Sequence, residues 1–226
     1  MKTIARQSKQ AVWLLLRTPS IGLASLVYSI IIHLSSLRAD LLDVADPWWV
    51  VTIGLVLLLS PLYHLFVIEI TASVLSKQPV SWHALPLDSF AALVVGELIV
   101  NAGVILGSVV FLLPGIYVGL RGIYYKQSII LHKTRALLGI QESFLMTRTP
   151  RVMLQMLLLL AVAYCIPLAV DFLLTPGTQS VWVHPVAILV STVFVAWVNV
   201  YVTISFQSLV DREEDAECPQ RSGYDT

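Results

Sequence analysis

Charged residues are scarce in this chain. They make up 12% of its 226 residues, whereas hydrophobic residues make up 57%. A water-soluble globular domain carries about 25% charged residues. This scarcity excludes an ordinary soluble domain and indicates that lipid, rather than water, surrounds much of the chain.

The chain also lacks a net charge, a cysteine framework and the common enzyme motifs. Its 14 basic and 14 acidic residues cancel, which argues against a nucleic-acid partner because phosphate binding needs clustered Lys and Arg. Cys165 and Cys218 have no spacing for a disulfide framework or a zinc site. No GxSxG, HExxH, Walker A or GxGxxG motif occurs, and the five histidines are scattered. We therefore expect a non-enzymatic protein with no catalytic residue, no metal and no cofactor.

Long runs of apolar residues make up most of the sequence. A spanning helix needs about 20 mostly apolar residues to cross about 30 Å of hydrocarbon. The sequence predicts an all-α, polytopic transmembrane bundle of one domain, residues 1–210, followed by a disordered cytoplasmic tail, residues 211–226. Six spans are expected, near residues 19–37, 48–75, 88–113, 115–132, 152–174 and 185–210.

The sequence Pro114-Gly115 separates the third expected span from the fourth. It either turns the chain between two spans or kinks one long broken helix. The turn is favoured because each side alone reaches about spanning length.

Lys and Arg are unevenly distributed between the connections. If six spans alternate, eleven of the fourteen basic residues share one side of the membrane: Lys2, Arg6, Lys9, Arg17, Lys77, Lys133, Arg135, Arg148, Arg151, Arg212 and Arg221. Cytoplasmic connections are enriched in Lys and Arg. Both termini are therefore expected in the cytoplasm, with residues 40–46 and 175–184 outside.

Two shorter segments, residues 2–16 and 134–147, precede spans and carry basic, amphipathic patterns. Helices of this kind lie in the membrane interface, with cations toward anionic headgroups. Both segments end in Arg-Thr-Pro, and the residue before Pro is pushed out of the α region. We expect two interfacial elbow helices. The shared ending reflects either a parallel internal repeat or chance convergence of helix-stop chemistry.

Burying an ionisable or strongly polar side chain inside a membrane span costs free energy, so each such residue is a candidate for a functional role. The candidates are His64, Glu69, Glu97, Asn101, Arg121 and Lys126. At 1.5 Å per residue from the cytoplasmic ends, Glu97 and Lys126 lie about 12–14 Å deep. Asn101 and Arg121 both lie about 20 Å deep. These matched depths predict a polar ladder between the third and fourth spans, which His64 and Glu69 could join from the second. The ladder either fixes helix packing or forms a proton or solute path.

The run LLPGIYVGLR, residues 112–121, resembles the LPGIY…R signature of a bacterial membrane-domain family. That family includes the membrane domain of some glycerophosphodiester phosphodiesterases and stand-alone six-helix inner-membrane proteins of unknown function. The residues that carry the resemblance are Pro114, Gly115, Tyr117, Arg121 and Ser143. The resemblance implies a six-helix protein of the bacterial inner membrane. It implies no phosphodiesterase activity, because no soluble stretch of this chain could form that enzyme's barrel.

Three functions remain open from the sequence. The first is a non-enzymatic inner-membrane protein that maintains the envelope or acts as a scaffold for other membrane proteins. The alternative is a small secondary transporter or ion-coupled permease that uses the ladder, and a membrane-embedded lipid enzyme ranks last. Expected partners are the lipid bilayer and possible other membrane proteins or further copies of the chain, with no nucleic acid. The first two functions differ in whether the region around Glu97 opens to water or is sealed by helix packing.

Overall fold

The computed structural model describes residues 2–39, 48–78, 87–174 and 183–217, and most of these are helical, with no strand among them. The helices are α1 (Lys2–Arg17), α2 (Pro19–Ala39), α3 (Trp48–Ser76), α4 (Leu87–Val110), α5 (Leu112–Arg121), α6 (Tyr125–Leu131), α7 (Ala136–Met146), α8 (Pro150–Leu174) and α9 (Val183–Glu217). The expected all-α class is therefore confirmed. The expected outer connections, residues 40–46 and most of 175–184, lie outside the described residues.

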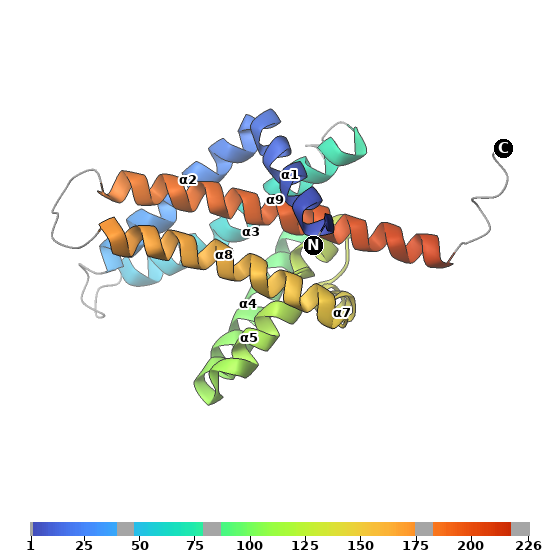
Figure 1. Ribbon diagram of the computed structural model, residues 1–226. Coiled ribbons are helices and arrows are strands. Elements are labelled where there is room, and N and C mark those ends of the chain that lie inside the picture. The colour runs from blue at the N-terminus through green and yellow to red at the C-terminus, as the bar shows by residue number, and fades with distance from the viewer. Residues whose placement is uncertain (1, 40–47, 79–86, 175–182, 218–226) are drawn as a thin grey trace.

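The longest helix, α9, lies at the centre of a bundle in which α2, α3 and α8 run alongside it (Figure 1). Helix α1 also packs against it. Its side chains Val200, Tyr201 and Phe206 are at most 1% exposed. The core of the bundle is therefore built around this helix.

Three helical segments are by themselves long and apolar enough to cross a membrane: Leu58–Ser76, Asp88–Val110 and Ile188–Arg212. The number rises to five if two bent helix pairs each form one span. These pairs are α1 with α2, bent by 90°, and α7 with α8, bent by 105°. The described residues thus form a helical membrane protein with three to five candidate spans, fewer than the six expected.

The fourth expected span, residues 115–132, is not one continuous helix but is broken into two. Helix α5 ends at Arg121 and α6 begins at Tyr125. The Arg121 carbonyl oxygen accepts hydrogen bonds from the hydroxyls of Ser143, at 2.7 Å, and Thr147, at 3.2 Å. The Tyr124 amide donates to Ser143 Oγ at 3.0 Å. Because side chains of α7 satisfy these backbone groups, the helix can stop there.

The turn between α4 and α5 falls at Phe111, three residues before Pro114. Phe111 is extended, and Pro114 lies in the first turn of α5, where its missing N–H removes no helical hydrogen bond. The two helices pack antiparallel, with Gly107 beside Gly115. The chain therefore reverses direction between α4 and α5, and the alternative of one long kinked helix is excluded.

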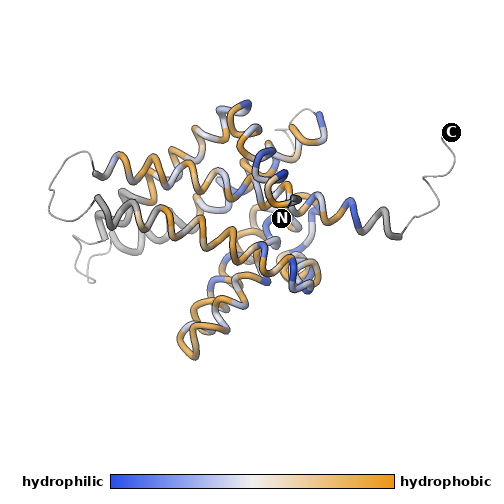
Figure 2. Tube along the Cα trace, in the orientation of Figure 1, coloured by the Kyte–Doolittle hydropathy of each residue, from blue (hydrophilic) through white to orange (hydrophobic). Residues whose placement is uncertain are grey.

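The α4–α5 hairpin projects away from the other helices (Figure 1) and is apolar along most of its length (Figure 2). At its tip, Val109, Phe111 and Leu113 are between 72% and 79% exposed. Large apolar side chains exposed together in this way need an apolar surrounding. Lipid supplies that surrounding in a membrane protein.

The tail was expected to be disordered from residue 211, but α9 continues to Glu217. Arg, Glu and Ala are strong helix formers, and between residues 212 and 217 the chain has one Arg, three Glu and one Ala. The helix can therefore extend past the apolar segment that ends at Arg212. Residues 218–226 lie outside the described part of the chain.

Candidate functional site

A partly open cavity of about 380 Å³ lies inside the bundle, between α2, α3, α4, α6, α8 and α9. Its polar lining comes mainly from α3, α4 and α6, with Asn199 added from α9, and its apolar lining comes mainly from α8 and α9. The lining residues are Tyr28, Ser60, His64, Glu97, Asn101, Lys126, Leu160, Ala163, Phe194, Val195, Val198 and Asn199. Sites for small molecules enclose about 300–1,000 Å³ and combine apolar walls with a few polar groups. This cavity fits that description.

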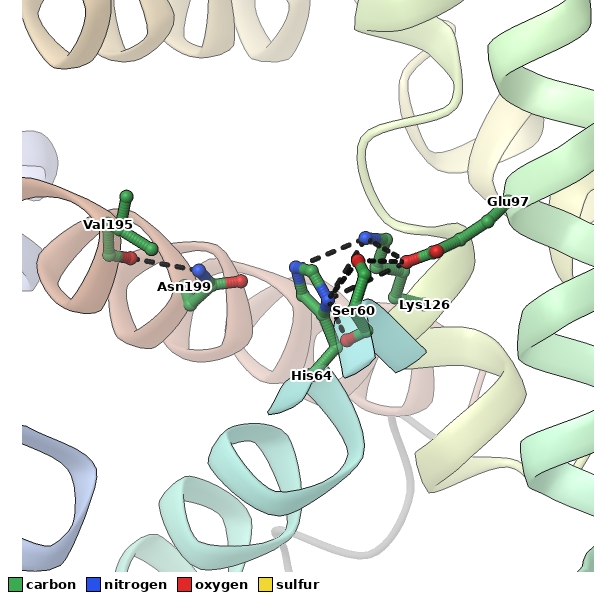
Figure 3. A network of polar contacts seen from close by, with 6 residues as sticks. All are labelled: Ser60, His64, Glu97, Lys126, Val195 and Asn199. Atoms are coloured by element: carbon green, nitrogen blue, oxygen red, sulfur yellow. Dashed lines mark hydrogen bonds and ion pairs between the residues drawn. The ribbon is translucent and has the colours of Figure 1, made fainter. Parts of the chain in front are cut away.

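A buried ion pair between Glu97 and Lys126 forms the polar wall (Figure 3). The Glu97 side chain, only 5% exposed, accepts a hydrogen bond from Lys126 Nζ at 2.6 Å. The same carboxylate oxygen accepts a second hydrogen bond from Ser60 Oγ at 2.9 Å. A charge-assisted hydrogen bond of this length is about twice as strong as a neutral one. The pair neutralises two charges that would be costly inside a span.

His64 joins this network as a neutral side chain. Its Nδ1 lies 2.7 Å from the Ser60 carbonyl oxygen, which can only accept, so we assign the ring proton to Nδ1. Lys126 Nζ lies at nearly equal distances from the two ring nitrogens, 3.2 Å from Nδ1 and 3.1 Å from Nε2. Lys126 therefore lies between a carboxylate and a neutral imidazole.

The positions of these side chains follow from their helices. Ser60 and His64 are four residues apart, so they occupy one face of α3. Glu97 comes from α4. Lys126 lies in the first turn of the short helix α6. The same break that divides the fourth expected span therefore sets the direction in which α6 presents Lys126.

The structure places the six predicted ladder residues in three different surroundings. His64, Glu97 and Lys126 form the network, and Asn101 lines the same cavity. Glu69 lies elsewhere on α3, and no hydrogen bond or ion pair among the described residues joins it to the network. Glu69, which could have joined the ladder from α3, is therefore not part of this network. It lies five residues beyond His64, which turns its side chain to another face of the helix.

Arg121 also lies outside the ladder, and its predicted place beside Asn101 was wrong. Its Nη1 donates a hydrogen bond of 2.7 Å to the carbonyl oxygen of Phe144. That oxygen belongs to the last turn of α7, where carbonyl groups have no partner within the helix. A cation at a helix C-terminus is also favoured by the helix dipole. Arg121 therefore caps α7 instead of facing the cavity.

The residues that carry the family resemblance lie along α5 and at its end, where Arg121 meets α7. Gly115 packs against the α4 backbone, and a Cβ added there would lie 2.7 Å from the Val104 carbonyl oxygen. The Arg121 guanidinium lies 5.5 Å from the centre of the Tyr117 ring. Ser143 hydrogen bonds both sides of the break between α5 and α6. Gly115 therefore allows α4 and α5 to approach closely, whereas Arg121 and Ser143 join the end of α5 to α7.

Sequence reasoning missed two polar residues of the cavity, Ser60 and Asn199. Ser60 lies one turn before His64 on α3, which was a signal that could have found it. Asn199 interrupts an apolar run in α9, and its amide donates to the Val195 carbonyl oxygen at 2.8 Å (Figure 3). A serine or single amide in a span is a weak signal, because each can hydrogen bond to its own helix.

Chemically, the site combines a proton-carrying network with a space for a solute. Carboxylate, ammonium and imidazole groups lie within hydrogen-bond distance of one another. Within the described residues, no group of three His, Cys, Asp or Glu side chains could hold a metal ion. The arrangement is suited to hydrogen bonding a polar solute or to moving a proton between its members.

No protein-family model, curated protein or solved structure matches this chain. The family resemblance of residues 112–121 therefore stays a hypothesis.

Proposed function

We propose that this chain is a non-enzymatic integral membrane protein that binds a small polar solute beside Glu97 and Lys126 and carries it across the membrane. The observation behind the proposal is that the buried ion pair lines a cavity of about 380 Å³. Charged side chains inside a membrane mark solute or ion paths when they face a cavity. A pair that served packing alone would be expected to be enclosed by side chains.

The break between α5 and α6 supports the same function. Transporters commonly bind their substrates where a membrane helix is discontinuous, because the break frees backbone and side-chain groups near the middle of the bilayer. Here the break lies between Arg121 and Tyr125, and Lys126 follows it directly. The cavity thus lies beside a discontinuous helix.

A scaffold for other membrane proteins is the second candidate. The exposed apolar tip of the α4–α5 hairpin, with Phe111 72% exposed, favours it. Such a surface suits contact with another membrane protein or a second copy of the chain as well as contact with lipid. Access of water to the cavity separates the two candidates.

Cysteine substitution tests this access, in a background where Cys165 and Cys218 are replaced with Ala. Asn199→Cys lies on the cavity wall, whereas Val193→Cys lies on the outward face of the same helix, where Val193 is 60% exposed. A water-soluble methanethiosulfonate should modify Asn199→Cys at least about tenfold faster, because the reactive thiolate forms where water reaches it. The rates are measured by mass spectrometry of the full chain in sealed vesicles.

Reaction of Asn199→Cys with reagent added to either side of the vesicles would support transport. Reaction from one side only would mean that the cavity binds a solute but that the protein does not carry it across the membrane. Equally slow reaction at both positions would mean that the cavity is sealed, which favours the scaffold.

We further propose a bacterial inner-membrane location with both termini in the cytoplasm and with α1 and α7 along the cytoplasmic surface. The distribution of Lys and Arg supports this orientation. The bends of 90° and 105° that follow α1 and α7 support their placement along the surface. In this arrangement α4 and the α5–α6 segment together leave the cytoplasmic side and return to it.

Single cysteines should report this topology in intact cells. Asp43→Cys and Gln179→Cys are expected to react with a membrane-impermeant thiol reagent, because they lie in the connections with few basic residues, which should face outward. Gln78→Cys and Gln141→Cys should react only after the cells are permeabilised. Labelling of either of these two in intact cells would contradict the proposed orientation.

A further inference from the structure

A second cavity, of about 240 Å³, lies where α1, α8 and α9 meet. It shares no lining residue with the cavity around Glu97. Along α9, Ser205 of the second cavity is six residues, or about 9 Å, from Asn199 of the first. The two cavities are therefore separate sites.

The polar floor of the second cavity is a closed hydrogen-bond network. Gln7 of α1 donates to Ser208 Oγ of α9 at 2.8 Å. Gln155 of α8 donates to Gln7 Oε1 at 3.1 Å and to the hydroxyl of Tyr201 at 2.6 Å. These bonds tie three helices together and fix the shape of the cavity.

Two arginines, Arg151 and Arg212, also line this cavity. Both are exposed, and neither forms an ion pair with an acidic side chain in the part of the chain whose side chains are described, which ends on α9 at Arg212. Two guanidinium groups that share one cavity without a carboxylate are suited to a phosphate, which each can bind through two parallel hydrogen bonds. The lining of the cavity therefore carries two positive charges and no acidic residue, which favours an anion.

The depth of the arginines points to a phosphate of the membrane itself. Arg151 is the second residue of α8, and Arg212 ends the apolar segment Ile188–Arg212. Both therefore lie at the ends of apolar segments, where lipid headgroups begin. Leu154 and Leu158, which are 57% and 53% exposed, follow Arg151 at helical spacing toward the apolar part of α8. An acyl chain can lie along these leucines while its phosphate stays at the arginines.

We propose that this cavity is a binding site for an anionic phospholipid, with its phosphate between Arg151 and Arg212 and an acyl chain along Leu154 and Leu158. This site is independent of the solute cavity. It would anchor the joined ends of α1, α8 and α9 to the headgroup region on one side of the membrane.

The experiment compares the full chain with Arg151→Gln and Arg212→Gln in phosphatidylcholine nanodiscs, with and without phosphatidylglycerol. Arg135→Gln is the matched control, since Arg135 is an exposed arginine at the start of α7 that does not line this cavity. Phosphatidylglycerol retained after extraction is measured by native mass spectrometry, and thermal stability is measured in both lipid compositions. Each cavity variant should weaken phosphatidylglycerol binding about tenfold, because it removes a charge-assisted hydrogen-bond donor.

In pure phosphatidylcholine the cavity variants should match the unmodified chain in thermal stability, which shows that they fold. Equal loss of phosphatidylglycerol from Arg135→Gln, or no loss from either cavity variant, would overturn the proposal. Inorganic phosphate and glycerol 3-phosphate, which carry the phosphate group but no acyl chain, are tested in detergent for their effect on thermal stability. If either stabilises the protein through Arg151 and Arg212 as strongly as phosphatidylglycerol does, the site binds a free phosphate and the lipid assignment is wrong.

Discussion

Lys126→Met should lower the free energy of unfolding by about 3–5 kcal/mol, because it leaves the Glu97 carboxylate buried without its cation. Glu97→Gln should also destabilise the protein, since it leaves the Lys126 ammonium with only His64 as a close partner. The double variant removes both charges and should recover much of the loss, which a double-mutant cycle measures directly. Thermal and denaturant unfolding of the full chain in one detergent provides the four free energies.

Lys9→Met is the control for the loss of a lysine as such, because Lys9 is exposed on α1. It should change the stability by less than about 0.5 kcal/mol, as surface substitutions usually do. Strictly additive effects of Glu97→Gln and Lys126→Met would mean that the two side chains do not interact. The assignment of the ion pair, and the cavity lining built on it, would then have to be abandoned.

Gly115→Ala should destabilise the α4–α5 hairpin by about 1–3 kcal/mol, the usual cost of overpacking. An added Cβ would lie 2.7 Å from the Val104 carbonyl oxygen and 2.8 Å from the Ser108 amide nitrogen. Both contacts are with backbone atoms, so the two helices would have to move apart. The same unfolding measurements in detergent report this loss.

Gly119→Ala is the matched control, one turn further along α5. Its added Cβ would meet only the Val104 side chain, at an ordinary contact distance of 3.6 Å. Because Ala is the better helix former by about 1 kcal/mol, this variant should be neutral or slightly stabilising. Equal effects of the two variants would show that α4 and α5 do not approach each other at Gly115.

Part of the candidate site could be predicted by counting along the helices. Equal depths put Glu97 and Lys126 at the same level, and the high cost of a lone charge in lipid made their pairing the favourable outcome. Depth alone does not specify the direction in which a side chain points, however. Arg121 lies only five residues from Lys126, yet it donates to the Phe144 carbonyl oxygen of α7. The break at residues 122–124 separates the two directions, and α7, which follows later in the chain, supplies the groups that stabilise it.

Hydropathy is a local property, and it determined that this chain is an all-helical membrane protein, because a run of apolar residues prefers lipid whatever its neighbours are. The sequence also predicted the helices α1 and α7, because the proline after each one stops the helix through its own geometry. Only the tertiary structure decided where the fourth expected span breaks and which polar side chains meet. These features depend on contacts between residues far apart in the chain, such as the Ser143 hydroxyl with the Arg121 carbonyl oxygen and Lys126 with Glu97. Such contacts depend on how helices rotate and pack against one another, and this information is absent from any single segment.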